Sequence, residues 1–202
     1  ALASCQHLEA GYFSVHREIA ASDVDLVLFL GDYIYETELK GYQRVRKHPH
    51  VFPGKQASAT LRDYRLHHAS YKLDADLRAC HAAHPWLLVW DDHEVMNDYA
   101  GLTEPDGTAQ AEFVKLRAAA YQAYFEHLPV SPHRAPVAAT MRMNDRYEWG
   151  QLAELWTVDT RQFRDQHVCN GWRGPDKGRM LLKCPEAAQS VRSMLGQDQE
   201  FW

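Results

Sequence analysis

The sequence predicts an α/β protein in which short buried strands alternate with helices. Two apolar runs of strand length, 26–30 and 87–90, each end abruptly in ionisable residues, and segments of helical periodicity lie between and after them. In α/β sheets the chemistry lies at the carboxyl ends of the strands, which is where these polar clusters fall. The 202 residues, 46% hydrophobic and 24% charged, are enough for one sizeable core.

The expected elements follow from periodicity and from the residues that end them. Helices are expected near 13–20, at 60–70, 74–83, 109–127 and 186–195, and another is expected to start at Asp198. The unbroken apolar run 26–30 is typical of a strand buried on both faces. Residues 37–59 are expected to cross the surface as a long loop. Between Thr140 and Asp159 the apolar period changes to two around Gly150, which predicts a hairpin.

Composition excludes some classes of partner. The net charge is -5 and no Lys/Arg cluster is interleaved with aromatics, so nucleic acid is not expected as a structural partner. The apolar runs are far shorter than the roughly 20 residues that cross a bilayer, so no membrane span is expected. Cys169 and Cys184 bracket a polar, glycine-rich segment, and a disulfide between them would place the protein outside the cytosol. The sequence leaves the oligomeric state open.

The stretch LLVWDDHEVMND, residues 87–98, places three carboxylates beside one imidazole. Such a group repels itself at neutral pH unless a cation lies within it, which indicates a metal site. The alternative is that Asp91 or Asp92 caps a following helix, with Glu94 in its first turn. Upstream, Gly31-Asp32 ends another buried run, and an aspartate there could bridge two cations about 3.5 to 4 Å apart. This second acidic strand end favours the metal site.

Several stretches together resemble the PhoD-type alkaline phosphatases and phosphodiesterases of the metallophosphoesterase superfamily. In chain order they are ASCQ, LVLFLGDYIYE, LRDYRLHHASYK, HPWLLVWDDHEVMNDYAG, LAELWTVDTRQFRD and SMLGQDQEFW. The motifs GDYIYE and WDDHEVMNDYA are the most specific, because each joins a buried strand to an uncommon string of ionisable residues. The resemblance implies a metallophosphoesterase-like β-sandwich core flanked by helices, in an enzyme secreted or exported to the periplasm.

The resemblance also implies a centre of ferric iron and calcium. Cys5 would ligate iron as thiolate, Tyr35 would ligate it as phenolate, and Asp32 would bridge iron and calcium. Thiolate and phenolate are good donors to ferric iron. Asp92 and Asn97 would supply oxygen ligands on the calcium side, although such oxygens also suit other divalent cations.

Two further residues are candidates for the chemistry itself. His93 would meet the phosphate or protonate the leaving alkoxide. Arg161 would either form a fork for the phosphate or support the acidic loop. Tyr33 and Tyr35 alternate along an extended segment, so only one of them can face the metals. Asp91, Glu94 and Asp98 are expected behind the ligands rather than on the metal, with Asp91 as a cap or hydrogen-bond acceptor.

The function predicted from these residues is a metal-dependent phosphoric ester hydrolase, a phosphomonoesterase or phosphodiesterase that uses metal-activated hydroxide on small-molecule or polymer phosphate esters. No GD-x-H motif follows Asp98, so residues 1–202 are expected to be a partial catalytic domain whose downstream half is absent. One alternative is a non-catalytic module that binds a cation or a phosphate-bearing surface. Another is a metal hydrolase of carboxylic or lactone esters.

Overall fold

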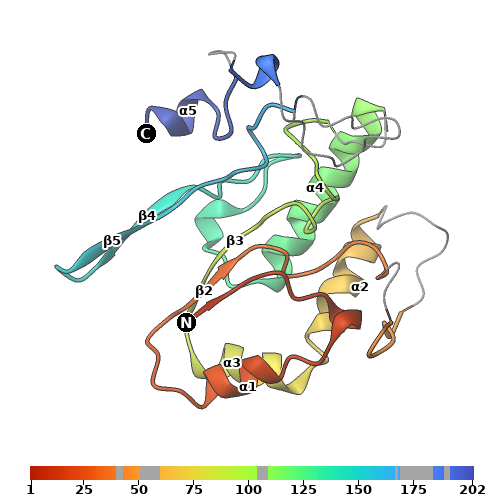
Figure 1. Ribbon diagram of the computed structural model, residues 1–202, viewed down its shortest axis with the longest axis vertical. Coiled ribbons are helices and arrows are strands. Elements are labelled where there is room, and N and C mark those ends of the chain that lie inside the picture. The colour runs from red at the N-terminus through yellow and green to blue at the C-terminus, as the bar shows by residue number, and fades with distance from the viewer. Residues whose placement is uncertain (40–42, 51–59, 104–108, 167, 169–183, 189–191) are drawn as a thin grey trace.

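The computed structural model describes residues 1–39, 43–50, 60–103, 109–166, 168, 184–188 and 192–202. Helices and short strands alternate along the first part of the chain, and a hairpin follows (Figure 1). The elements are β1 (Leu2–Ala3), η1 (Leu8–Ala10), α1 (Ser14–Ala20), β2 (Val27–Leu30), α2 (Leu61–Tyr71), α3 (Ala75–Ala83), β3 (Trp86–Val89), α4 (Gln110–His127), η2 (Pro132–Arg134), β4 (Asp145–Trp149), β5 (Ala153–Thr157), η3 (Pro185–Ala188) and α5 (Gln197–Glu200). The predicted α/β class is confirmed.

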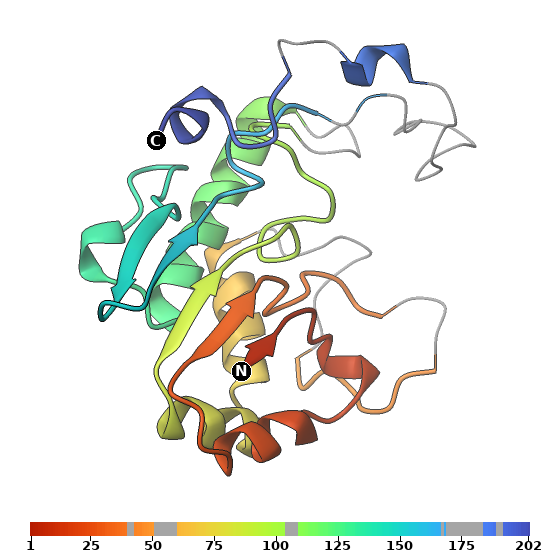
Figure 2. The ribbon, with the colours of Figure 1, turned by 60° about the vertical axis from the view of Figure 1, so that its left-hand side comes forward.

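A parallel sheet of order β1-β2-β3 positions two loops that carry acidic residues, one after β2 and one after β3 (Figure 2). These are called the acidic loops below. Val27 pairs with Trp86 and Leu30 with Val89, so β2 and β3 end level with each other. The loops that begin at Gly31 and at Trp90 therefore leave the sheet side by side. Strand β1 was not expected from the sequence, because two residues carry no periodic signal and their pairing with Leu28 and Phe29 is long-range.

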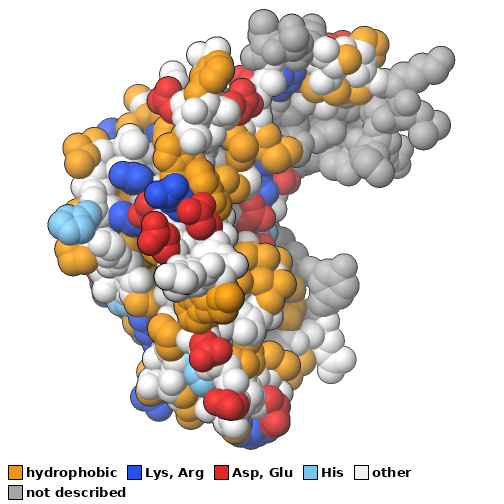
Figure 3. Space-filling model, turned by 90° about the vertical axis from the view of Figure 1, so that its left-hand side faces the viewer, with side chains coloured by type: hydrophobic (Ala, Val, Ile, Leu, Met, Phe, Trp, Pro, Cys, Tyr) orange, Lys and Arg blue, Asp and Glu red, His pale blue; other side chains and the backbone are white. Residues whose placement is uncertain are grey.

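Helices cover one face of this sheet, and the other face is open (Figures 1 and 2). On the covered face, Phe29 is fully buried and packs against Trp86, with ring centroids 5.8 Å apart. On the open face, Leu30 is 50% exposed, so the prediction of a strand buried on both faces is wrong for the described part of the chain. Side chains of β2, β3 and β5 line an open cavity of about 390 Å³ there. On the side of the molecule shown in Figure 3, hydrophobic patches are interspersed with basic and acidic side chains.

The predicted hairpin is formed by β4 and β5, with Asp145 opposite Thr157 and Trp149 opposite Ala153. Its first strand begins later than the period of two suggests. The side chain of Gln162 bonds both the backbone N and the backbone O of Met141, at 3.1 and 2.9 Å. Because those groups are already engaged, they are not available to a strand partner.

The helix predicted over 186–195 is wrong in its described part. Only the 3-10 helix η3 forms, and residues 189–191 lie outside the described residues. Further on, the Ser193 hydroxyl accepts hydrogen bonds from Leu195 N and Gly196 N, at 3.1 and 2.6 Å. The backbone N of Ser193 donates to the Asp165 carboxylate. Short polar side chains that bond nearby backbone groups in this way compete with helix formation.

Two further predictions concern a disulfide and a membrane-spanning helix. The predicted Cys169–Cys184 disulfide lies outside the described residues, because Cys169 is not among them. Among the described helices, none has the length and apolar composition needed to cross a membrane.

His68, which is buried, and His81, which is half-buried, are expected to contribute a loss of stability in acid. Burial lowers the pKa of His81 to about 4, and it lowers the pKa of His68 well below its usual value. The unfolded chain therefore binds protons below pH 6.5 that these two histidines do not bind in the folded chain, so their contribution to stability is complete above that pH and is lost as the pH drops toward 4. His81 alone would account for on the order of 3 kcal/mol.

Denaturant unfolding at pH 8 and at pH 5 measures this loss. The variant His81→Phe, which retains a flat ring to stack on Trp86 at 3.9 Å, should be less sensitive to acid than the parent. Replacing the exposed His133 by glutamine should leave the pH dependence unchanged. An equal change in stability between pH 8 and pH 5 in the parent and in His81→Phe would contradict the prediction.

Candidate metal centre

The two acidic loops are tied together by a pair of buried glutamates that cross in opposite directions. Glu94, from the loop after β3, accepts hydrogen bonds from Tyr33 N at 2.6 Å and from Asp91 N at 3.0 Å. Glu36, from the loop after β2, accepts from His93 Nδ1 at 2.7 Å and from Asn97 N at 2.9 Å. Glu94 was expected behind the ligands, whereas no role was predicted for Glu36. The sequence signal for Glu36 is its place as the second carboxylate of the motif GDYIYE.

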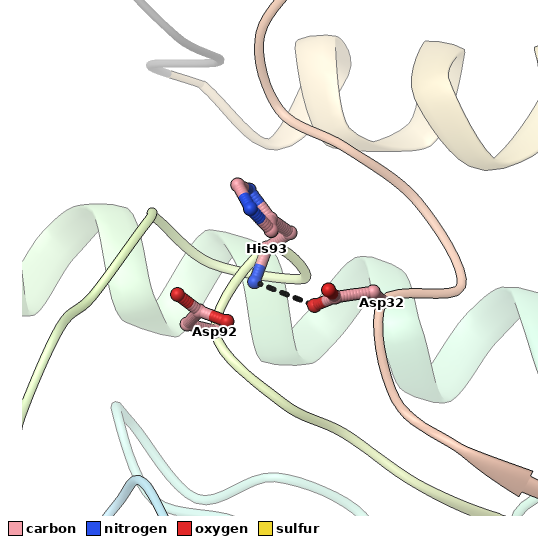
Figure 4. A group of neighbouring side chains, drawn as sticks. All are labelled: Asp32, Asp92 and His93. Carbon is pink, nitrogen blue, oxygen red and sulfur yellow. Dashed lines mark hydrogen bonds between the residues drawn. The ribbon is translucent and has the colours of Figure 1, made fainter. Parts of the chain in front are cut away.

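Between these loops Asp32, Asp92 and His93 each offer a ligand atom, and the three atoms lie within 4.8 Å of one another (Figure 4). Asp32 and Asp92 are buried, at 6% and 5% exposure. Burial raises the pKa of Asp32, and the negative charges of Asp92 and Asp91 raise it further. A cation among these oxygens would offset both effects, so the donor set fits a metal.

Tyr35, and not Tyr33, faces this group. Tyr35 Oη donates to Asp32 Oδ2 at 3.0 Å. Tyr33 is fully buried, and its hydroxyl is hydrogen-bonded to His81 Nε2 at 2.9 Å on the covered side of the sheet. The alternation predicted for the two tyrosines is therefore confirmed. The Tyr35 ring lies against the His93 ring, with centroids 4.1 Å apart.

Cys5 lies beside Asp32 at the end of β1. Its backbone N donates to Gly31 O at 3.1 Å, and its thiol interacts with Asp32 and Tyr35. Cys5 is exposed, but partial desolvation raises the pKa of its thiol and the charge of Asp32 adds to the increase, so a cation bound here would favour the thiolate. Both Cys5 and Asp32 have left-handed backbones, with φ of 55° and 56°. Such strained non-glycine backbones concentrate at functional sites.

The segment after β3 forms turns rather than a helix, which overturns the alternative that its acids cap a helix. Asp92 Oδ2 accepts from Asp98 N at 2.5 Å, which curls the segment around the carboxylate. Asn97 is exposed, and its side-chain amide donates to Asp98 Oδ2 at 2.9 Å. The role of Asn97 as a ligand stays a prediction.

Arg161, which is 70 residues from Asp91 in the sequence, contacts the acidic loop that follows β3. Its Nε lies 2.5 Å from Asp91 Oδ1, and its Nη2 lies 3.4 Å from Asp92 Oδ1. Asp159, fully buried, fixes the backbone by accepting from Arg161 N at 2.9 Å. The remaining nitrogen, Nη1, is buried and has no hydrogen-bond partner among the described residues. Asp91 is thus an acceptor, as expected.

The acidic neighbours of His93 favour its protonated form. Burial acts to lower the pKa of His93, but the hydrogen bond and charge of Glu36, together with Asp92 and Asp32, outweigh it and raise the pKa to about 9. An imidazole that keeps its proton at neutral pH can donate to a leaving oxygen but cannot ligate a cation, so within this group the oxygens of Asp32 and Asp92 are the atoms that fit a metal.

The whole of residues 1–202 matches the model of one protein family, PhoD-like phosphatase. The chain belongs to the PhoD-like phosphatase family. Alkaline phosphatase D of Bacillus subtilis (strain 168) is 41% identical over 203 residues, covering 100% of this chain and 33% of the relative. A solved structure titled "Structure of PhoD" matches with a TM-score of 0.89 and 40% identity, covering 100% of this chain and 37% of that one. The PhoD-like chain thus spans about a third of the length of these relatives, and its fold is correspondingly incomplete.

Proposed function

We propose that this PhoD-like chain carries part of the active site of a metal-dependent phosphoric ester hydrolase. The observation that carries the proposal is the convergence of Asp32, Asp92 and His93 where the two acidic loops meet. The similarity to a protein named alkaline phosphatase D supports phosphate esters, mono- or diesters, as substrates. The family resemblance supports a secreted or periplasmic location.

The metal ligands follow the chemistry of the donors. Cys5, Tyr35 and Asp32 would hold ferric iron, with Asp32 shared with calcium. Asp92 and Asn97 would hold calcium through oxygen. When bound, the cations offset the charge of the transferred phosphoryl group and increase the acidity of water.

The chain's own residues would position the substrate and move the proton. His93 Nδ1 is already hydrogen-bonded to Glu36. The other ring nitrogen, Nε2, is therefore the one that would donate a proton to the leaving oxygen of the ester. Arg161 holds Asp91 and Asp92 in place, and its unpartnered Nη1 offers a donor for a phosphate oxygen.

Metal analysis and chelation of the protein that carries this chain test the proposal. We expect iron and calcium in the purified protein, and at least about a 100-fold loss of p-nitrophenyl phosphate and bis-p-nitrophenyl phosphate hydrolysis after chelation. Adding the metals back should restore the rate. Calcium binding without hydrolysis would favour the non-catalytic module, and faster cleavage of a carboxylic ester would favour the third function. Full activity in metal-free protein would overturn the metal dependence.

A further inference from the structure

Glu36 is a buried carboxylate that holds a side chain and a backbone group of the opposite loop at once. Its side chain is 1% exposed. Oε2 accepts from His93 Nδ1 at 2.7 Å, and Oε1 accepts from Asn97 N at 2.9 Å. A carboxylate that uses both oxygens in this way has one orientation, and that orientation fixes both donors.

The two contacts of Glu36 fix the position of the His93 imidazole relative to the Asp92 carboxylate. One contact fixes His93 directly. The other fixes the backbone at Asn97, and the next residue, Asp98, donates its N to Asp92 Oδ2 at 2.5 Å. Glu36 therefore sets the position of His93 relative to Asp92, which lie next to each other in sequence but present different chemistry.

Glu94 shows what a purely structural carboxylate looks like in the same place. It is equally buried, at 1% exposure, and also crosses between the loops. Its carboxylate, however, accepts hydrogen bonds from the backbone groups Tyr33 N and Asp91 N. Glu94 can thus hold the loops together without acting on the His93 ring.

Among the described residues, the Tyr35 ring is the other group that restrains the His93 ring. Tyr35 packs on it with centroids 4.1 Å apart and an interplanar angle of 30°, which limits tilt but not rotation in the plane of the ring. The hydrogen bond from Nδ1 removes that remaining freedom and determines which nitrogen stays available. Carboxylates that orient a histidine in this way fix both its tautomer and its direction.

We propose that Glu36 is the positioning residue of this centre, which holds His93 through Nδ1 so that Nε2 meets the phosphate ester. The inference rests on the proposed function, because His93 acts on substrate only if the centre hydrolyses one. Glu36 itself does not touch the substrate, and its effect passes through His93.

A double-mutant cycle separates positioning from support of the fold. In metal-loaded protein that carries this chain, Glu36→Ala should lower kcat about 10- to 100-fold with little change in KM. In a His93→Ala background the same change should cost little more, because the group that it positions is already absent. Glu36→Gln, which keeps an acceptor, should recover part of the rate. Glu94→Gln, the matched control, should lower activity by the same factor in both backgrounds.

A second readout does not depend on turnover. In metal-free protein labelled with 15N-histidine, the Nδ1-bound proton of His93, assigned by its loss in His93→Ala, should be visible in the parent and in Glu94→Gln. It should be absent in Glu36→Ala. An unchanged signal in Glu36→Ala, or losses of kcat that add in the cycle, would overturn the proposal. A visible signal in a protein that hydrolyses no phosphate ester would instead overturn the proposed function, while the hold on His93 would stand.

Discussion

Replacing Asp32 by alanine should reduce phosphate ester hydrolysis by about 1,000-fold or more and remove most of the bound metal. Asp32 is the residue on which the centre converges. Its carboxylate accepts hydrogen bonds from Tyr35 Oη at 3.0 Å and from His93 N at 3.4 Å. Burial and the charge of Asp92 raise its pKa. Within the group of Asp32, Asp92 and His93, Asp32 is the member that comes from the β2 loop, so its loss removes that loop's carboxylate ligand from the group.

Metal content and stability, measured together, identify the cause of the loss. Because burial disfavours the charged form of Asp32, the metal-free Asp32→Ala variant should be at least as stable as the metal-free parent. The parent should gain stability when metal is added, and the variant should gain much less. The exposed Asp23→Ala is the matched control and should behave like the parent. Retention of full metal content by Asp32→Ala would remove Asp32 from the ligand set.

Much of the site could be predicted because its residues lie immediately after two recognisable strands. A buried apolar run and the acids that follow it are local in sequence, and parallel pairing brings the two ends to one edge of the sheet. Asp32 and Asp92 meet for this reason. Local alternation indicated that only one of Tyr33 and Tyr35 could face the centre, and the family resemblance implied that it was Tyr35.

The features that were missed depend on contacts between distant residues. The Glu36 contact with His93 joins positions 57 residues apart, and no local pattern indicates it. The sequence predicts that both faces of β2 are buried because all of its side chains are apolar. The exposure of one face, however, depends on which other segments pack against it, and the apolar run does not determine that. The helix predicted near the C-terminal end failed because Ser193 bonds its own backbone neighbours, an outcome that periodicity does not register.

Replacing Gly31 by alanine should cost at least about 3 kcal/mol of stability and abolish metal binding. Gly31 lies where the backbones of the two acidic loops come into contact. An added Cβ would lie 2.4 Å from Asp91 N and 2.7 Å from Trp90 C, and φ is +98°. Backbone atoms cannot rotate away as a flexible side chain can, so the two strand ends would have to separate. Asp32, the next residue, would move away from Asp92.

Two other glycines separate the effects of contact and strain. Gly11→Ala has an extended backbone and nothing within 4 Å, so it should be neutral. Gly150→Ala has a φ of +56° but also has open space, so it should cost only about 1 to 2 kcal/mol and leave metal binding intact. Denaturant unfolding and metal titration of the three variants compare the costs. If Gly31→Ala cost no more than Gly150→Ala, the approach of the two backbones would not be what holds the acids together, and the centre would depend on the crossed glutamates alone.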